Sequence, residues 1–502
     1  MTADTMLDLT SVTKLSDRLT VEYLEFNGVL PVVVGQGRVQ VATWLAAPDP
    51  QVIDDLRFVF DAEPEILQGA EADVRAAIRR AYGSQGTVEG MIAGLATDEV
   101  RSTNGDDTPI DDLVHLANEA PVVKLVNLLL LEALEARASD VHLEGYAEEL
   151  RVRYRVDGVL QDAPTPPSHL KAAIVSRLKI MADLDIAERR VPQDGRIRLR
   201  LQNRDVDVRV STVPVLHGES IVLRLLDKER GRIGLEALGM GESTLRRFDE
   251  VISRPHGIVL ATGPTGSGKT TTLYAAVDRI RTGREKILTV EDPIEYELPG
   301  VPQVPVHEKA GVTFATALRS LLRQDPDVLL IGEIRDDETA EIATHAALTG
   351  HLVLSTLHTN DAPSALTRLL DLGVASYLVA STVEAVLAQR LVRRICSACR
   401  VEEPLEANAT RAFGIRSEVL TGVYRGKGCS ECRGTGFLGR TGIYELLVMS
   451  DALRLELQQR RGAGELRALA VAGGMQTLRE DGLRLVREGL TTLEEVFRVA
   501  QE

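Results

Sequence analysis

One short segment constrains the fold of this chain more than any other. An apolar run at residues 257–262 is followed by GPTGSGKT at 263–270 and then by a helical pattern at 271–281. This order is typical of a phosphate-binding loop, in which glycines let consecutive backbone amides face an anion at a helix N-terminus. The segment therefore predicts an α/β domain with a nucleoside triphosphate site at the end of a strand.

The residues of this loop have separate predicted roles. Lys269 is expected to reach the β- and γ-phosphates of ATP, and the Thr270 hydroxyl is expected to ligate Mg²⁺. A glycine-rich turn that matches by chance is the alternative, which the match at all eight positions disfavours. We expect the nucleotide to contact Gly263, Pro264, Thr265, Gly266, Ser267, Gly268, Lys269, Thr270 and Thr271.

Two further apolar runs end in carboxylates. The run at 287–290 is followed by EDPIE at 291–295, and the run at 327–332 is followed by Glu333. Open α/β sheets bind ligands at the carboxyl ends of their strands, so both segments are candidates for holding Mg²⁺ or orienting water. A solvated acidic turn is the alternative for the first segment. The second is similar to a Walker B strand, although Gly332 stands where an aspartate commonly precedes the glutamate.

All four cysteines of the chain lie in two CxxC pairs that 29 residues separate. Four thiolates in this pattern are typical of tetrahedral Zn²⁺, and a reducing compartment favours metal binding over disulfides. Nothing indicates an open coordination position, so a structural site is predicted. A thioredoxin-like redox pair is the alternative. The expected zinc ligands are Cys396, Cys399, Cys429 and Cys432.

Bulk properties narrow the class of protein. A chain of 502 residues is expected to contain several domains. Its net charge of −16 and its 4% aromatic content speak against gripping nucleic acid. No apolar run reaches the ~18–20 residues of a membrane span, and the N-terminal segment lacks the apolar block of a signal peptide. We therefore expect a cytoplasmic protein that reaches a membrane only through a partner.

Pattern and composition divide the chain into six segments. Strand patterns at 29–34 and 38–44 and a helix opening at Pro50 indicate a small α/β domain, which a linker rich in Gly, Ser, Thr and Asp follows. A second domain with helices and alternating strands precedes the core. Residues 150–156 alternate as a strand, and Asp157-Gly158 after them is a hairpin turn signal. The predicted segments are an N-terminal partner-docking domain at 1–83, the linker at 84–110, a second domain at 111–228, the ATPase core at 235–395, the cysteine module at 396–440 and a helical C-terminal domain at 441–502.

The order of four motifs resembles that of the ATPases of the type II/type IV secretion superfamily. The motifs correspond to a Walker A, an aspartate, a Walker B and a histidine box, at 263–270, 291–295, 327–333 and 349–360. From about residue 117 onward the chain looks like the assembly ATPases of type II secretion. This resemblance implies a RecA-like P-loop domain, preceded by a PAS-like domain and a small α/β domain, with a zinc-binding insertion and a helical tail.

The resemblance also implies roles for single residues. It assigns activation of the attacking water to Glu295, the Mg²⁺ side to Glu333 and sensing of the γ-phosphate to His358. Arg196 and Arg209 are implied to approach the γ-phosphate like arginine fingers, for which a guanidinium fork is suited. A surface arginine beside a glycine turn is the alternative for each of these two.

The implied activity is ATP hydrolysis by a homohexamer with ATP, Mg²⁺ and Zn²⁺, docked at the inner membrane on secretion platform proteins, namely the cytoplasmic domain of the L component and the F component. Its output would be pseudopilus assembly and protein export across the outer membrane. Three alternatives stay open: a type IV pilus extension ATPase, a nucleic-acid translocase and a small-molecule kinase. In the family, the cysteine insertion separates secretion and pilus-extension ATPases from retraction motors.

Overall fold

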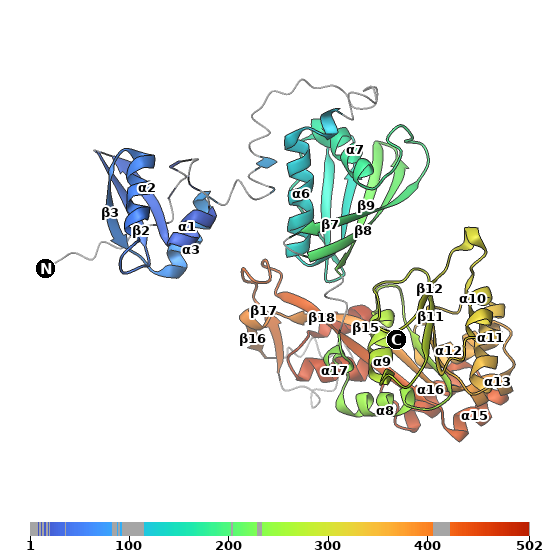
Figure 1. Ribbon diagram of the computed structural model, residues 1–502. Helices are drawn as coiled ribbons and strands as arrows, with labels where there is room; N and C mark the ends of the chain where they lie inside the picture. The colour runs from blue at the N-terminus through green and yellow to red at the C-terminus, as the bar shows by residue number, and fades with distance from the viewer. Residues whose placement is uncertain are drawn as a thin grey trace. The chain divides into compact units, whose positions relative to one another are not determined.

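The computed structural model describes residues 21–35, 37–82, 115–201, 204–227, 233–404 and 422–500, with isolated residues between 9 and 19 and between 88 and 92. Most of the predicted linker at 84–110 lies outside the described residues. The chain divides into two compact units, Met1–Leu225 and Leu226–Glu502. Both units combine helices with sheets, which confirms the predicted α/β class (Figure 1).

The first unit begins with a small domain that has its own core. Its sheet has the order β1-β2-β3, with β1 and β2 antiparallel and β2 and β3 parallel. Helix α2 starts as predicted, because Pro50 occupies its first position and the Asp49 carboxylate caps the N–H of Gln51. The elements are α1 Val21–Asn27, β1 Val29–Gly35, β2 Arg38–Thr43, α2 Pro50–Phe60, β3 Glu63–Gln68 and α3 Glu71–Tyr82.

The rest of the first unit is a six-stranded sheet of order β6-β5-β4-β9-β8-β7. Helices α6 and α7 contribute to one apolar core with the sheet, and within this core region the Lys179 ammonium donates to Glu219 at 2.7 Å. The predicted hairpin turn at Asp157-Gly158 is present, with positive φ at both residues. The elements are α6 Ala120–Glu135, β4 Ala138–Gly145, β5 Leu150–Val156, β6 Val159–Asp162, α7 Lys171–Met181, β7 Gln193–Leu201, β8 Arg204–Val215 and β9 Gly218–Asp227.

The second unit is built on a seven-stranded sheet of order β12-β11-β13-β14-β10-β15-β18. The first six strands are parallel, and β18 is antiparallel to β15. Strands β10, β11, β13 and β14 are buried along their whole length, which explains why they read as continuous apolar runs. The strands are β10 Gly257–Thr262, β11 Ile287–Glu291, β12 Gln303–Pro305, β13 Val328–Ile331, β14 Leu352–Leu357, β15 Val383–Ile395 and β18 Phe437–Val448.

Helices cover both faces of this sheet. Alternate residues of the strands divide between two apolar cores, one shared with α8 and α9 and the other with the remaining helices. A two-stranded ribbon of β16 Arg400–Glu403 and β17 Val423–Gly426 lies apart from the main sheet in the hydrogen-bond order. The helices are α8 Glu242–Ile252, α9 Lys269–Ile280, α10 Phe314–Leu321, α11 Asp337–Leu348, α12 Ala362–Asp371, α13 Ser376–Thr382, α15 Asp451–Gln458, α16 Ala463–Ala472, α17 Leu478–Arg487 and α18 Leu493–Val499.

The C-terminal region differs from the predicted division of the chain. Strand β18 pairs with β15 from Ala385 to Ile395, so residues on both sides of the 440/441 boundary complete the ATPase sheet. Leu453, Leu466 and Leu485, from three of the C-terminal helices, are buried in the same core as β10 and β14. The helical region from 441 onward is therefore part of the ATPase unit. Among the helices that the structure describes, none is long and apolar enough to cross a membrane.

Candidate nucleotide site and metal centre

The predicted phosphate-binding loop connects β10 to α9. Its glycines are required by the backbone, since φ is 149° at Gly263, 79° at Gly266 and 90° at Gly268. A Cβ at Gly263 would lie 2.6 Å from both the Gln389 carbonyl oxygen and the Ser267 hydroxyl. The loop tip is exposed, whereas Thr270 and Thr271 lie half-buried in the first turn of α9. This is the strand, loop and helix order that a phosphate cradle needs.

The side chain of Lys269 is folded into the loop. It is 8% exposed, and its ammonium donates to the carbonyl oxygens of Gly263 at 2.8 Å and Pro264 at 3.2 Å. Burial lowers the pKa of Lys269 to about 8, the charge of Glu333 opposes this shift and the charge of Arg390 adds to it. A cation held by neutral oxygens in this way has charge available for a phosphate.

Strand β15 supplies two polar residues beneath the loop. The Gln389 amide donates to the Ser267 carbonyl oxygen at 2.8 Å, and the buried Arg390 guanidinium donates to the Asn360 carbonyl oxygen at 2.8 Å. Sequence reasoning missed both side chains. The available signal was the pair Gln-Arg interrupting the apolar run VEAVLAQRLV within the predicted core. Together they connect the loop with the segment that follows β14.

Parallel strand order brings Glu333 and His358 together. Glu333 follows β13 and His358 follows the adjacent β14, and the Glu333 carboxylate lies 3.2 Å from Nε2 of His358. The other oxygen of Glu333 lies 2.5 Å from Nη2 of Arg335. Glu333 is also close enough to Lys269 to influence its pKa. These residues therefore form one charged cluster at the carboxyl edge of the sheet, beside the loop.

Glu295 occupies a different part of the same edge. It follows β11, which is three strand spacings from β10, about 14 Å at ~4.8 Å per spacing. Glu295 is half-buried, and its charge adds to burial and to Glu291 in raising the pKa of the Tyr274 phenol, so it lies near that ring. Glu291 itself is buried and accepts hydrogen bonds from Tyr274, Thr289 and Gln303. For the Glu295 carboxylate to reach the phosphates, the segment after β11 would have to extend across this distance.

The two candidate arginines lie in the first unit. Arg196 on β7 and Arg209 on β8 are directly opposite each other in the antiparallel pair, so their side chains share one face of the sheet. Arg196 is exposed and Arg209 is half-buried. The apolar residues between them, such as Ile197 and Val208, face the core instead. The pairing was not evident in the sequence, because it depends on the register of the two strands.

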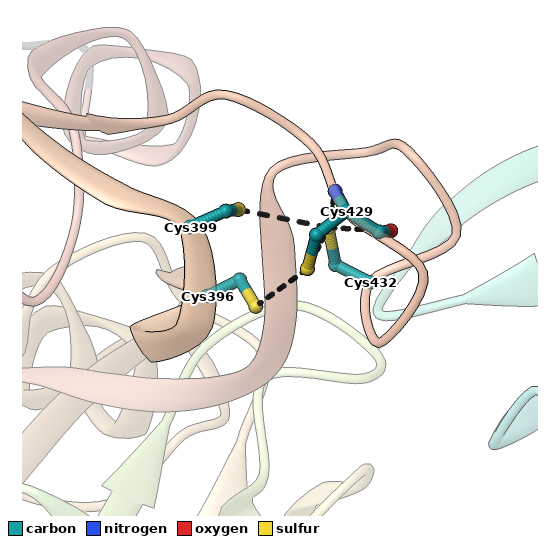
Figure 2. Close-up of side chains that lie close together, drawn as sticks. All are labelled: Cys396, Cys399, Cys429 and Cys432. Atoms are coloured by element: carbon teal, nitrogen blue, oxygen red, sulfur yellow. Dashed lines mark hydrogen bonds between the residues drawn. The ribbon is translucent and has the colours of Figure 1, made fainter. Parts of the chain in front are cut away.

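The four predicted metal ligands converge in the second unit (Figure 2). All four Sγ atoms lie within 4.8 Å of one another, with separations of 3.8 Å for Cys396 and Cys429, 3.9 Å for Cys399 and Cys432, and 3.7 Å for Cys429 and Cys432. A tetrahedral Zn²⁺ with Zn–S bonds of about 2.3 Å requires S–S separations of about 3.8 Å. These three separations match that value, so the cysteines fit a tetrahedral thiolate site.

Backbone groups support this cluster. The N–H groups of Cys429 and Gly436 each donate to Sγ of Cys432 at 3.2 Å. Burial raises the pKa of Cys432, but these N–H groups and hydrogen bonds from the Cys429 and Cys399 thiols outweigh burial, so the pKa falls to about 6. A side chain at Gly426 would collide with the Gly436 carbonyl, so both glycines are needed for the close approach of the chain. Such N–H···S bonds favour the thiolate form that binds metal.

Known proteins match nearly the whole chain. Residues 115–498 match the protein-family model described as "Type II/IV secretion system protein", and residues 7–88 match the MshEN domain. The type II secretion system protein E of Xanthomonas campestris pv. campestris is 48% identical over 489 residues, which is 96% of this chain and 85% of that protein. The type IV pilus assembly ATPase PilB of Myxococcus xanthus is 45% identical over 472 residues, 93% of this chain and 83% of that protein.

A solved structure is similar in fold as well. The crystal structure of the pilus retraction motor PilT with bound ADP aligns with a TM-score of 0.51 and 26% sequence identity. The alignment covers 74% of this chain and 96% of that chain. The alignment therefore includes nearly the whole of that protein's chain.

Proposed function

Because this chain belongs to the type II/IV secretion system protein family, we propose that it is the motor of a type II protein secretion system. It is an ATPase of secretion. We propose that ATP hydrolysis drives pseudopilus assembly at the inner membrane and so exports proteins across the outer membrane. The observation that carries this proposal is the 48% identity to a type II secretion protein E over 96% of the chain.

In this proposal the loop residues and the charged cluster divide the work. Lys269 leaves its carbonyl partners to hold the β- and γ-phosphates, and the amides of the loop take up the remaining charge. Thr270 and Glu333 would hold Mg²⁺, which would neutralise charge on the phosphates. His358 contacts Glu333. It senses whether the γ-phosphate is present and transmits this to β14, the strand that it follows. Glu295 orients and deprotonates the attacking water.

The arginines come from the first unit. Arg196 and Arg209 share one sheet face, so a single approach of that face presents both guanidiniums to a phosphate. The arrangement supports a role for both residues at the γ-phosphate.

We further propose that the four cysteines bind one structural Zn²⁺. All four ligands are thiolates, and a saturated tetrahedron leaves no position for a reactant. The working form is a homohexamer at the inner membrane, in which residues 1–83 dock on the cytoplasmic domain of the L component and the F component completes the platform. The protein is cytoplasmic, and membrane association comes through these partners.

A type IV pilus extension motor is the second candidate, since PilB of M. xanthus is 45% identical over 93% of this chain. The two candidates share the same chemistry and differ in the filament that is assembled. A nucleic-acid translocase is disfavoured by the net charge of −16.

A chromosomal Lys269→Ala substitution in the source organism distinguishes the type II secretion motor from the type IV pilus extension motor. The proposal expects secreted proteins to accumulate inside the cells while surface pili are normal. Loss of pili with normal secretion would instead establish the pilus motor. Western blots of the variant protein at wild-type level provide the control for expression.

A further inference from the structure

A cavity lies beside the phosphate-binding loop. It has a volume of about 540 Å³, and its wall is shared by the loop, the segment after β14, strands β15 and β18, and the C-terminal helices. This volume is within the ~300–1,000 Å³ of small-molecule sites. Its lining residues include Pro264, Asn360, Arg390, Glu445, Arg467 and Arg479.

Arg390 places a buried charge in this wall. Its side chain is 8% exposed, and its hydrogen bonds go to the carbonyl oxygens of Gln389 and Asn360 and to the amide oxygen of Asn360. These acceptors are neutral. Burial lowers the pKa of the guanidinium, and the nearby carboxylates Glu445 and Asp361 oppose this shift. A buried cation bonded to neutral groups is stabilised by any anion that enters the cavity.

Glu445 provides the second observation. It is fully buried; its Oε1 accepts the N–H of Ala362 at 2.9 Å, whereas its Oε2 has no hydrogen-bond partner among the described residues. A buried polar atom without a partner is uncommon and costs free energy unless a ligand or water satisfies it. The cavity wall therefore contains a polar atom that a bound molecule would satisfy.

We propose that this cavity is a binding site for a small oligophosphate anion, separate from the nucleotide site of the loop. Its wall holds four arginines and the carboxylates Asp361 and Glu445. Two of the arginines also have carboxylate partners, since Arg467 lies 3.8 Å from Asp361 and Arg498 lies 2.8 Å from Glu495. Planar guanidiniums recognise phosphate oxygens through paired hydrogen bonds, so phosphate suits this wall better than a compact, weakly coordinating anion. A hydroxyl of the protonated phosphate, or a bound water, would donate to the free oxygen of Glu445.

The site is connected to catalysis through Arg390. The same guanidinium that faces the cavity donates to Asn360 in the histidine-box segment, and it lies 3.0 Å from the position that a Cβ on Gly263 would take. An anion that fixes Arg390 would therefore fix the phosphate-binding loop and the segment after His358. The cavity would act as a regulatory site for the proposed ATPase activity.

Calorimetry on the full-length chain tests this proposal. The protein is first saturated with Mg-ADP, and inorganic pyrophosphate is then titrated in excess Mg²⁺. The proposal expects one further pyrophosphate site per chain with ADP retained. Displacement of ADP one for one, or absence of a second binding event, would overturn it. The ADP signal tests the proposed function and the pyrophosphate signal tests the cavity. Failure of the proposed function is therefore distinguishable from failure of the cavity proposal.

Variants assign the binding to this cavity. Arg467→Gln should weaken pyrophosphate binding about tenfold, because one charge-assisted hydrogen bond is lost. Glu445→Gln keeps shape and removes a negative charge, so binding should tighten several-fold. Arg246→Gln, at an exposed helix ion pair with Glu242, is the matched control and should change nothing.

If Glu445→Gln fails to fold, Arg479→Gln replaces it and should weaken binding, since that guanidinium packs over the Phe497 ring at the cavity wall. Unchanged affinity in Arg467→Gln, or weaker binding in a folded Glu445→Gln, would overturn the assignment. Sulfate at equal ionic strength should not compete, and equal competition by sulfate would show recognition of charge alone and contradict the oligophosphate site.

Discussion

Lys269 is buried in the loop with two carbonyl oxygens as its partners, so the residue is positioned for a phosphate before any ligand arrives. Lys269→Ala should reduce ATP turnover below about a tenth of wild type and weaken nucleotide binding, because the β/γ charge loses its direct counterion. Phosphate release and nucleotide titration measure both effects. Lys309→Ala, at an exposed position, is the control. Turnover above a tenth of wild type would refute the loop assignment.

Two carboxylates lie at the same sheet edge, and isosteric substitutions distinguish their roles. Glu295→Gln keeps shape and loses basicity, so turnover should slow strongly while ATP is still bound. Glu333→Gln should weaken Mg²⁺-dependent nucleotide binding, since Glu333 belongs to the cluster around Lys269. Single-turnover kinetics and Mg²⁺ titration separate these effects. The two roles are reversed if the Glu333→Gln variant is inactive with normal Mg²⁺ dependence while the Glu295→Gln variant has near-normal turnover.

Glu495 predicts a pH effect on stability. Burial raises its pKa, but hydrogen bonds from Arg498 and Arg393 outweigh burial and lower the pKa from 4.5 to about 2. A carboxylate with a depressed folded-state pKa stabilises the protein above pH 4.5, and this contribution is lost as pH falls toward 2. Glu495→Gln should therefore destabilise the ATPase unit by ~2–3 kcal/mol at pH 7, and the difference from wild type should shrink by ~1 kcal/mol at pH 4.

The measurement is the melting midpoint of the ATPase unit for both proteins at the two pH values. Glu494→Gln is the matched control, because that neighbouring carboxylate is exposed. A difference between Glu495→Gln and wild type that stays constant from pH 7 to pH 4 would contradict the assigned pKa shift.

At the scale of elements, we propose that a bound Zn²⁺ stabilises the cysteine module. Its ribbon has only two short strands, β16 and β17, so packing alone gives it little stability. We predict one Zn²⁺ per chain by elemental analysis, and Cys429→Ser should loosen residues 396–440 while nucleotide binding persists. Hydrogen exchange of β16 and β17 reports the loosening, with Ser430→Ala as the control. A metal content near zero in protein purified without chelators would rule out the site.

Elements whose signal is local could be predicted from the sequence. Strand β10 and its loop follow from an apolar run and fixed glycines, and β5 with its turn at Asp157 follows from strict alternation. Strand β4 was missed, because Asp140 and His142 interrupt its apolar residues. In the fold Asp140 is satisfied by Arg224, 3.1 Å away on β9. A partner 84 residues along the chain is not visible as a local pattern.

The candidate site follows the same rule: residues with a local signal could be predicted, and contacts that depend on strand order could not. The motifs identified Lys269, Glu333 and the cysteines, since each motif carries its own spacing. The contact between Glu333 and His358 depends on β13 lying beside β14, which is a property of strand order. Gln389 and Arg390 were missed for a related reason: their role beneath the loop exists only because β15 is adjacent to β10. Positions of elements in the sheet, rather than residue types, limited the prediction.

At the scale of the whole molecule, the residues that we propose to be catalytic lie in both compact units. Lys269 and Glu333 belong to one unit, and Arg196 and Arg209 belong to the other. We propose that the units close over the nucleotide, so that the arginines reach the γ-phosphate. In a ring, closure of one subunit shifts its neighbours, which converts a chemical step into a mechanical one. An isolated chain lacks the neighbouring contacts that hold the closed form.

The specific ATPase activity of the full-length chain, measured against protein concentration with mass determined by light scattering, tests this coupling most directly. The account predicts low turnover while the chain is monomeric and a marked rise over the concentrations at which hexamers form. Arg196→Gln and Arg209→Gln should assemble normally and lose most of this rise. Specific activity that stays constant across the assembly transition would contradict the central claim that this ATPase works as a ring motor.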